Sequence, residues 1–132
     1  MASRMYEVQT EVFSLLKESK KLDKLTNGVY DYVPEKTKTP YVTFGQITSL
    51  PSDSKTDEGE KVTVALEIWS ENKGRKEAVM IMNEVEDTLK EEFDLETAYI
   101  IHQKVVSREV WEEAYGLYHA IIEKEYVLGW DD

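Results

Sequence analysis

The chain of 132 residues is acidic: 27 Asp and Glu residues against 16 Lys and Arg give a formal net charge of −11. This charge argues against a protein that holds nucleic acid through phosphate contacts, because such contacts need Lys and Arg. It suits a surface that DNA passes without adhering, since like charges repel. The absence of cysteine excludes disulfides, thiolate nucleophiles and cysteine zinc sites.

The length predicts one domain over residues 1–132, able to bury roughly two-thirds of the surface of its unfolded chain. No long apolar run occurs, so we expect no membrane-spanning helix. Polar residues interrupt the N-terminal stretch, which is unlike a signal peptide. The protein is therefore expected to stay in the compartment where it is made.

The first segment, residues 3–19, predicts an amphipathic helix with Ser3 as its N-cap. One stripe of this helix is apolar and comprises Met5, Val8, Val12, Leu15 and Leu16. Leu22 and Leu25 are expected to anchor a short turn before Asn27-Gly28.

Three strands are predicted next, at residues 29–33, 41–50 and 61–69. The third has the clearest alternation, with one face formed by Val62, Val64, Leu66 and Ile68. Residues 51–60 between the second and third strands are polar and lack an apolar anchor. They predict a mobile loop.

A second helix is predicted from residue 72 or 74 to 93, and a final hairpin from strands at 99–111 and 118–128. The apolar face of this helix comprises Ala78, Ile81, Met82, Val85, Leu89 and Phe93, and Met80 points away from it. The order α-β-β-β-α-β-β predicts an α+β fold, a mainly antiparallel sheet of about five strands with two helices on one face.

Few residues are candidates for chemistry. His102 and His119 fall on the last two strands. One interpretation is that they face each other and bind a metal with Glu123 or Glu125; ordinary strand histidines are the alternative. No HExxH, DxDxDG, GxSxG or P-loop pattern occurs. We therefore assign no catalytic, cofactor-binding or metal-binding residue, and expect no enzyme. Trp130 lies in a predicted short tail, residues 129–132, and docks either on its own domain or on a partner.

Charge along the second helix opposes the helix dipole. Its start carries Lys73, Arg75 and Lys76, and its predicted end carries Glu91 and Glu92. Tertiary packing can simply tolerate this arrangement. The alternative is that the basic end meets the acidic end of an identical neighbour, head to tail. That hypothesis gives a subunit interface comprising Arg75, Lys76, Met80, Glu91 and Glu92.

Several short motifs together resemble a known family. These are Val29-Tyr30-Asp31-Tyr32-Val33-Pro34, then Pro40-Tyr41-Val42, Lys55-Thr56-Asp57-Glu58-Gly59, Ile68-Trp69-Ser70 and Gly74-Arg75-Lys76-Glu77-Ala78. Their order and spacing are similar to those of the phage tail-completion family, the tail-terminator or tail-to-head joining proteins of long-tailed bacteriophages and prophages.

The resemblance implies a structural virion protein that caps the tail tube as a hexameric ring and joins it to the head connector. It implies no enzymatic activity and no cofactor, with DNA passing through without specific binding and no contact with a membrane. The expected location is the head–tail interface of the virion, after assembly in the host cytoplasm. It also implies a loop that orders on assembly, comprising Ser52, Asp53, Ser54, Lys55, Thr56, Asp57 and Glu58.

Two other functions have weaker support in the sequence. An acidic module that mimics DNA and inhibits a nucleic-acid-binding protein needs carboxylates in two rows at phosphate-like spacing. Here the acids are scattered among Lys and Arg. A small enzyme at the final hairpin would depend on His102 and His119 alone.

Overall fold

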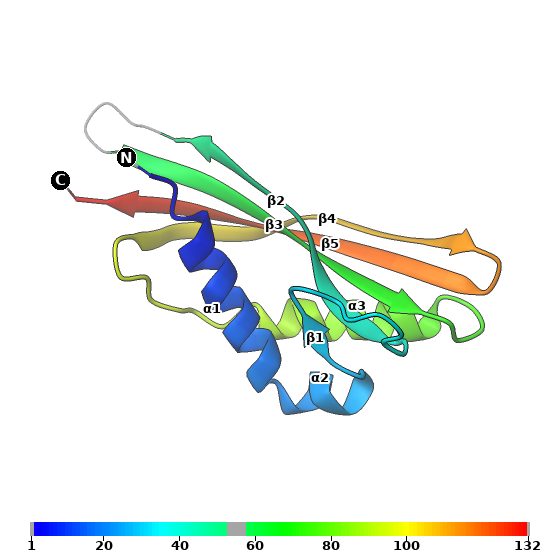
Figure 1. The fold of residues 1–132 in the computed structure, drawn as a ribbon. Helices are drawn as coiled ribbons and strands as arrows, with labels where there is room; N and C mark the ends of the chain where they lie inside the picture. The colour runs from blue at the N-terminus through cyan, green and yellow to red at the C-terminus, as the bar shows by residue number, and fades with distance from the viewer. Residues whose placement is uncertain (1, 53–57, 132) are drawn as a thin grey trace.

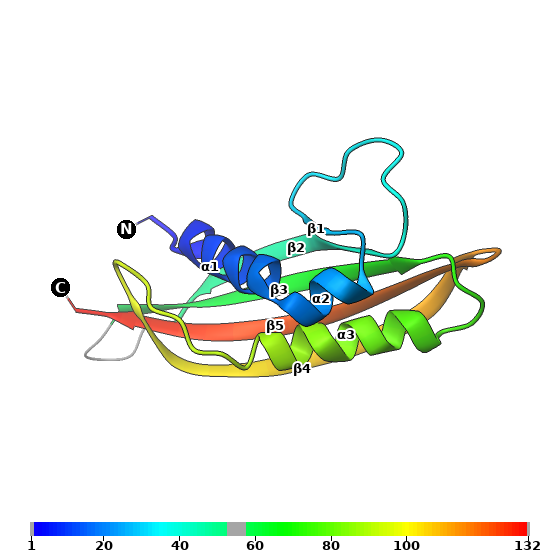
Figure 2. The same cartoon turned by 90° about the horizontal axis from the view of Figure 1, so that it is seen from below.

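A computed structural model describes residues 2–52 and 58–131 of the chain. These residues form three helices and a five-stranded sheet of order β1-β2-β3-β5-β4. All three helices lie on the same face of the sheet (Figure 1 and Figure 2). The α+β fold class and the predicted order of elements are confirmed, with one short helix added.

The centre of the sheet is the antiparallel pair of β3 (Glu58–Ser70) and β5 (Leu117–Trp130). The predicted alternation of β3 is confirmed, because Val62, Val64, Leu66 and Ile68 are 0% exposed. Ile122 and Leu128 of β5 lie on the same buried face. Burying such a side chain is worth about 1.5–3 kcal/mol, so these two strands hold much of the core.

The longer helices, α1 (Met5–Glu18) and α3 (Lys76–Thr88), cover this buried face. Their core residues are Val8, Val12 and Leu16 of α1 and Ala78, Ile81, Met82 and Val85 of α3. The prediction of Ser3 as N-cap of α1 was wrong. Arg4 occupies that position without a capping side chain, because the Ser3 hydroxyl donates to Glu60 while accepting from the Met5 amide at 3.0 Å.

The predicted turn after α1 is a six-residue helix, α2 (Lys20–Leu25). Ser19 caps it, accepting a hydrogen bond from the Leu22 amide at 3.2 Å, and Leu22 is fully buried. A serine before a short run of helix-forming residues is the sequence signal for this element.

Helix α3 ends at Thr88, five residues before the predicted end at Phe93. The Lys90 amide bonds to the Asp87 carbonyl at 3.3 Å, so the last turn tightens and the chain leaves the helix. Phe93 still reaches the core, packing against Tyr126 with ring centroids 5.3 Å apart. Because Phe93 continues the helical spacing of apolar residues in the sequence, the C-terminal end of the helix was predicted too late.

Strand β1 (Val29–Tyr30) is shorter than the predicted strand 29–33 and pairs in parallel with β2 (Tyr41–Pro51). A parallel neighbour requires the chain to cross back, and residues 31–40 make that crossing as a loop that projects from the body (Figure 2). The Asn27 side chain ties its base by donating to the carbonyls of Lys38 and Thr39.

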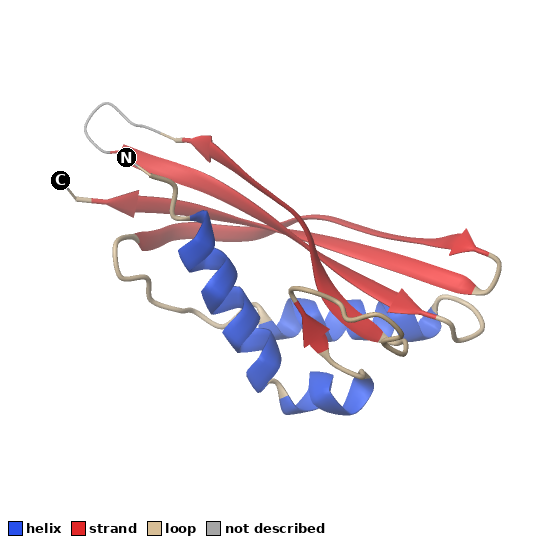
Figure 3. Cartoon of the chain, in the orientation of Figure 1, coloured by secondary structure: helices blue, strands red, loops and turns tan. Residues whose placement is uncertain are grey.

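Strand β4 (Tyr99–Ala114) forms the final hairpin with β5 through Tyr115 and Gly116, as predicted (Figure 3). Gly116 has φ +76°, a conformation that favours glycine. Gly129 and Trp130 belong to β5, so the predicted tail at 129–132 was wrong. Trp130 is only 8% exposed and lies 3.7 Å beneath the Arg4 guanidinium.

Glu60 joins the start of the chain to the sheet. Its carboxylate accepts hydrogen bonds from the hydroxyls of Ser3 and Ser49 and from the Arg4 amide at 2.8 Å. Burial opposes ionisation of this group, but the hydrogen bonds outweigh it and hold the pKa of Glu60 below its ordinary value. The ionised carboxylate therefore stabilises the folded state.

Replacing Glu60 by Gln should lower the free energy of unfolding by about 1–3 kcal/mol at pH 7, because three donors lose a charged acceptor. Since the folded pKa is lowered, this contribution is present above the ordinary Glu value of about 4.3 and is lost as pH falls through the lower folded value. Urea unfolding of both proteins at several pH values measures this difference. A difference that stays constant down to acid pH would contradict the prediction, and exposed Glu35→Gln is the control.

Candidate assembly surfaces

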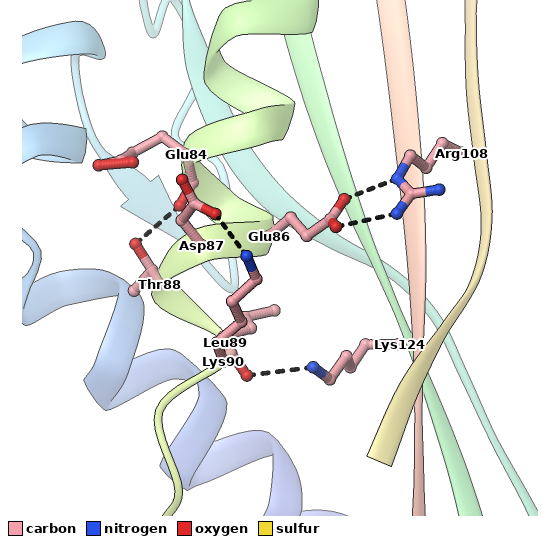
Figure 4. Close-up of polar contacts among 8 residues, drawn as sticks. All are labelled: Glu84, Glu86, Asp87, Thr88, Leu89, Lys90, Arg108 and Lys124. Carbon is pink, nitrogen blue, oxygen red and sulfur yellow. Dashed lines mark hydrogen bonds and ion pairs between the residues drawn. The ribbon is translucent and has the colours of Figure 1, made fainter.

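The C-terminal end of α3 is held by cations from the sheet (Figure 4). Buried Lys124 of β5 donates to the Leu89 carbonyl at 3.1 Å, just beyond the helix. Arg108 of β4 forms two hydrogen bonds with Glu86, at 2.6 and 2.9 Å. Lys90 pairs with Asp87 at 3.1 Å. Positive charge near the last carbonyls suits the helix dipole.

These contacts bear on the prediction that charge along this helix opposes its dipole. Glu91 and Glu92 lie after the helix rather than within it, and two of the acidic residues near its end are paired, Glu86 by Arg108 of the sheet and Asp87 by Lys90. The hydrogen bonds from Arg108 hold the pKa of Glu86 below its ordinary value. Burial lowers the pKa of Lys124, and neighbouring Lys90 acts in the same direction. The reversed charge of α3 is thus largely balanced inside the subunit.

Replacing Lys124 by Met should lower the free energy of unfolding by about 1–3 kcal/mol, because the Leu89 carbonyl loses its donor in a buried place. Arg108→Met should cost less, since the side chain is half exposed to solvent. Lys104→Met removes an exposed ion pair of 3.8 Å and should leave stability nearly unchanged. Chemical denaturation measures the free energy of unfolding of each variant and ranks the three losses. An equal loss for all three would contradict this account of the helix end.

The N-terminal end of α3 borders a shallow groove against α2. Leu25 and Met80 form its apolar floor and are 36% and 48% exposed, which confirms that Met80 points away from the core. Its basic border comprises Lys21, Lys24, Lys73 and Lys76. Arg75 lies apart from it, with its guanidinium 5.5 Å from the centre of the Tyr118 ring.

The structure therefore separates the residues of the predicted subunit interface. Lys76 and Met80 lie together at the groove, and Arg75 packs on the sheet nearby. Glu91 and Glu92 are exposed at the opposite end of α3. The two sets do not meet within one subunit.

The loop predicted at 51–60 is shorter at both ends than expected. Pro51 ends β2, and residues 58–60 begin β3. Of the predicted assembly loop, Ser52 donates its amide to the Gly59 carbonyl at 3.0 Å, and Glu58 accepts from the Trp130 indole at 3.2 Å. Its other residues, Asp53, Ser54, Lys55, Thr56 and Asp57, lie outside the described residues.

The sheet face opposite the helices carries an aromatic row. Cross-strand pairing aligns Tyr41, Trp69, His119 and Trp111 across β2, β3, β5 and β4. The His119 ring stacks on Trp69 at a centroid distance of 3.6 Å and tilts against Trp111 at 4.5 Å. Its two ring nitrogens lie 2.5 Å from Glu67 and 3.5 Å from Glu113. His119 is only 5% exposed, although no helix covers this face in the described part of the chain.

The two histidines do not face each other as predicted. His102 pairs with Val127 and His119 with Trp111, near opposite ends of the hairpin. Within residues 2–52 and 58–131, no three His, Cys, Asp or Glu side chains are grouped to hold a metal ion. In the same residues, no helix has the length and apolar character needed to cross a membrane.

Carboxylates dominate the rest of this sheet face. Glu67, Glu109 and Glu123 occupy positions on it, alternating with the buried side chains of their strands. Glu125 lies there too, flanked by Lys61 and Lys104 at 3.8 Å each. One side of the sheet is thus acidic and aromatic, while the helical side carries the lysine-bordered groove.

The fold is shared with solved virion and phage structures. A chain from the virion of a native gene transfer agent particle matches with a TM-score of 0.87 and 17% identity, over 98% of this chain and 99% of that one. The gp17 protein of bacteriophage SPP1 matches with a TM-score of 0.63 and 22% identity, over 92% and 88%. At these identities the likeness establishes the fold alone. A comparison with curated proteins gives no match.

Family membership follows from the sequence match. The model of the family described as tail completion protein gp17 matches residues 10–128, nearly the whole chain, so the chain belongs to that family. The protein is thus a tail completion protein of the phage type, a structural component of the virion tail. The resemblance found in the sequence motifs is confirmed.

Proposed function

We propose that identical subunits of this protein form a hexameric ring that caps the tail tube and joins it to the head connector. The family match over residues 10–128 carries this proposal. The fold supports it, because the helices cover one side of the sheet and leave an open side with carboxylates that suits a channel lining. A ring of subunits joined head to tail has two unlike ends, one for the tube and one for the connector.

In this ring the open face of the sheet is turned toward the DNA channel. Its carboxylates Glu67, Glu109 and Glu123 repel phosphate and keep the genome from adhering. The ring works by geometry, without enzymatic activity or cofactor.

Mixing the protein with its tail tube protein should end tube growth and give short tubes with a ring at one end. The reason is that a closed ring leaves no free tube-like surface for the next layer. Negative-stain electron microscopy measures tube length, and native mass spectrometry measures the ring. A protein that stays monomeric and leaves tube length unchanged, even with tube protein present, would overturn the proposal.

Replacing Glu109 and Glu123 by Lys should convert the channel lining into a DNA-binding surface while the ring still forms. Binding of duplex DNA by the assembled ring should then appear and weaken steeply with added salt, because released counterions supply the affinity. The same charge change on the helical side, Glu11→Lys with Glu18→Lys, is the matched control. Equal DNA binding by both variants would contradict the assignment of the sheet face to the channel.

A further inference from the structure

The groove between α2 and α3 exposes apolar side chains beside a border of lysines. Among the described residues, none of Lys21, Lys24, Lys73 and Lys76 has a carboxylate at ion-pair distance. Two carboxylates at its border are already engaged. Glu77 accepts from the Ser70 hydroxyl at 2.7 Å, and Asp87 pairs with Lys90. The remaining border carboxylate, Glu84, lies at the Lys21 and Lys24 end.

The lysines determine what kind of surface can cover the exposed Leu25 and Met80. Two copies of this groove match each other poorly, because lysines outnumber carboxylates along each border and like charges at an interface are unfavourable. The occupant must carry carboxylates beside apolar groups.

A segment of that chemistry lies at the other end of α3. Residues 91–96 expose Glu91, Glu92, Asp94 and Glu96, while Phe93 and Leu95 are half buried between them. In the described chain none of these four carboxylates has an ion-pair partner. Glu7 of α1 fixes the segment by accepting hydrogen bonds from the Glu96 and Thr97 amides at 3.0 and 3.3 Å. A segment held in place loses little conformational entropy on binding.

We propose that the groove of one subunit binds residues 91–96 of a second copy of this chain. Lys73 and Lys76 of the groove lie at the opposite end of α3 from residues 91–96, so the contact is head to tail and repeats from subunit to subunit. This inference rests on the proposed ring and names the surfaces that close it. It also gives a role to the charges that oppose the dipole of α3, since Lys73 and Lys76 sit where a helix favours acidic residues.

The test uses two charge-reversed variants of the full chain. The groove variant is Lys73→Glu with Lys76→Glu, and the segment variant is Glu91→Lys with Glu92→Lys. Each reversal puts the charge that the helix dipole prefers at that end of α3, so folding is not at risk. Lys36→Glu with Lys38→Glu makes the same charge change in the exposed loop 31–40 and serves as control.

Each reversed variant alone should require at least about tenfold more protein for ring formation with tube protein present, measured by light scattering and native mass spectrometry. An equimolar mixture of the two should recover rings of alternating subunits, since each groove then meets a segment of opposite charge. The control should assemble like the wild type.

The outcomes separate this contact from the ring itself. If wild type and both variants form rings equally well, the contact is wrong and the ring proposal stands. If the variants fail and their mixture also fails, the two surfaces do not meet each other and the contact is wrong. If the wild type itself forms no ring with tube protein, both proposals are overturned.

Discussion

The organising constraint of this molecule is that helices cover only one face of its sheet. A sheet covered on one side must bury alternate residues of each strand and expose the others. Strand β3 obeys this with Val62, Val64, Leu66 and Ile68 on the buried face. Most polar side chains of the central strands are thereby directed to the open face, where Glu67 and Glu123 lie with Glu109 of the edge strand β4. Surface charge is therefore a consequence of strand register.

Lys124 is one of the exceptions to this alternation, and its contacts explain why it is buried. It occupies a buried position on β5, between Ile122 and Tyr126, where an apolar residue would satisfy the pattern. Its ammonium group compensates for that burial by donating to the Leu89 carbonyl, which the end of α3 leaves unpaired. Because the sheet provides the cations for this helix end, Glu91 and Glu92 are left without an internal role.

Features that depend on local sequence patterns were predicted correctly, and features that depend on contacts between distant residues were not. The alternation of β3 and the stripe of α1 are periodic and were predicted correctly. The end of α3 was misplaced because Phe93 keeps the helical spacing while entering the core from a loop. Trp130 looked like part of a tail because its partners, Arg4 and Glu58, are distant in sequence. The enclosure of His119 between two tryptophans likewise needs the register of three strands, which no local pattern contains.

In the proposed ring, the asymmetry of the subunit bears on how the addition of subunits stops. A head-to-tail contact gives a closed ring or an endless filament, depending on the rotation between neighbours. The groove and the acidic segment are both held rigidly, by α2 and α3 at one end and by Glu7 of α1 at the other. Because both surfaces are held rigidly, the rotation between neighbouring subunits is the same at every contact. Closure of the proposed ring would use every groove and every segment, so that no lysine-bordered groove would remain to bind another subunit.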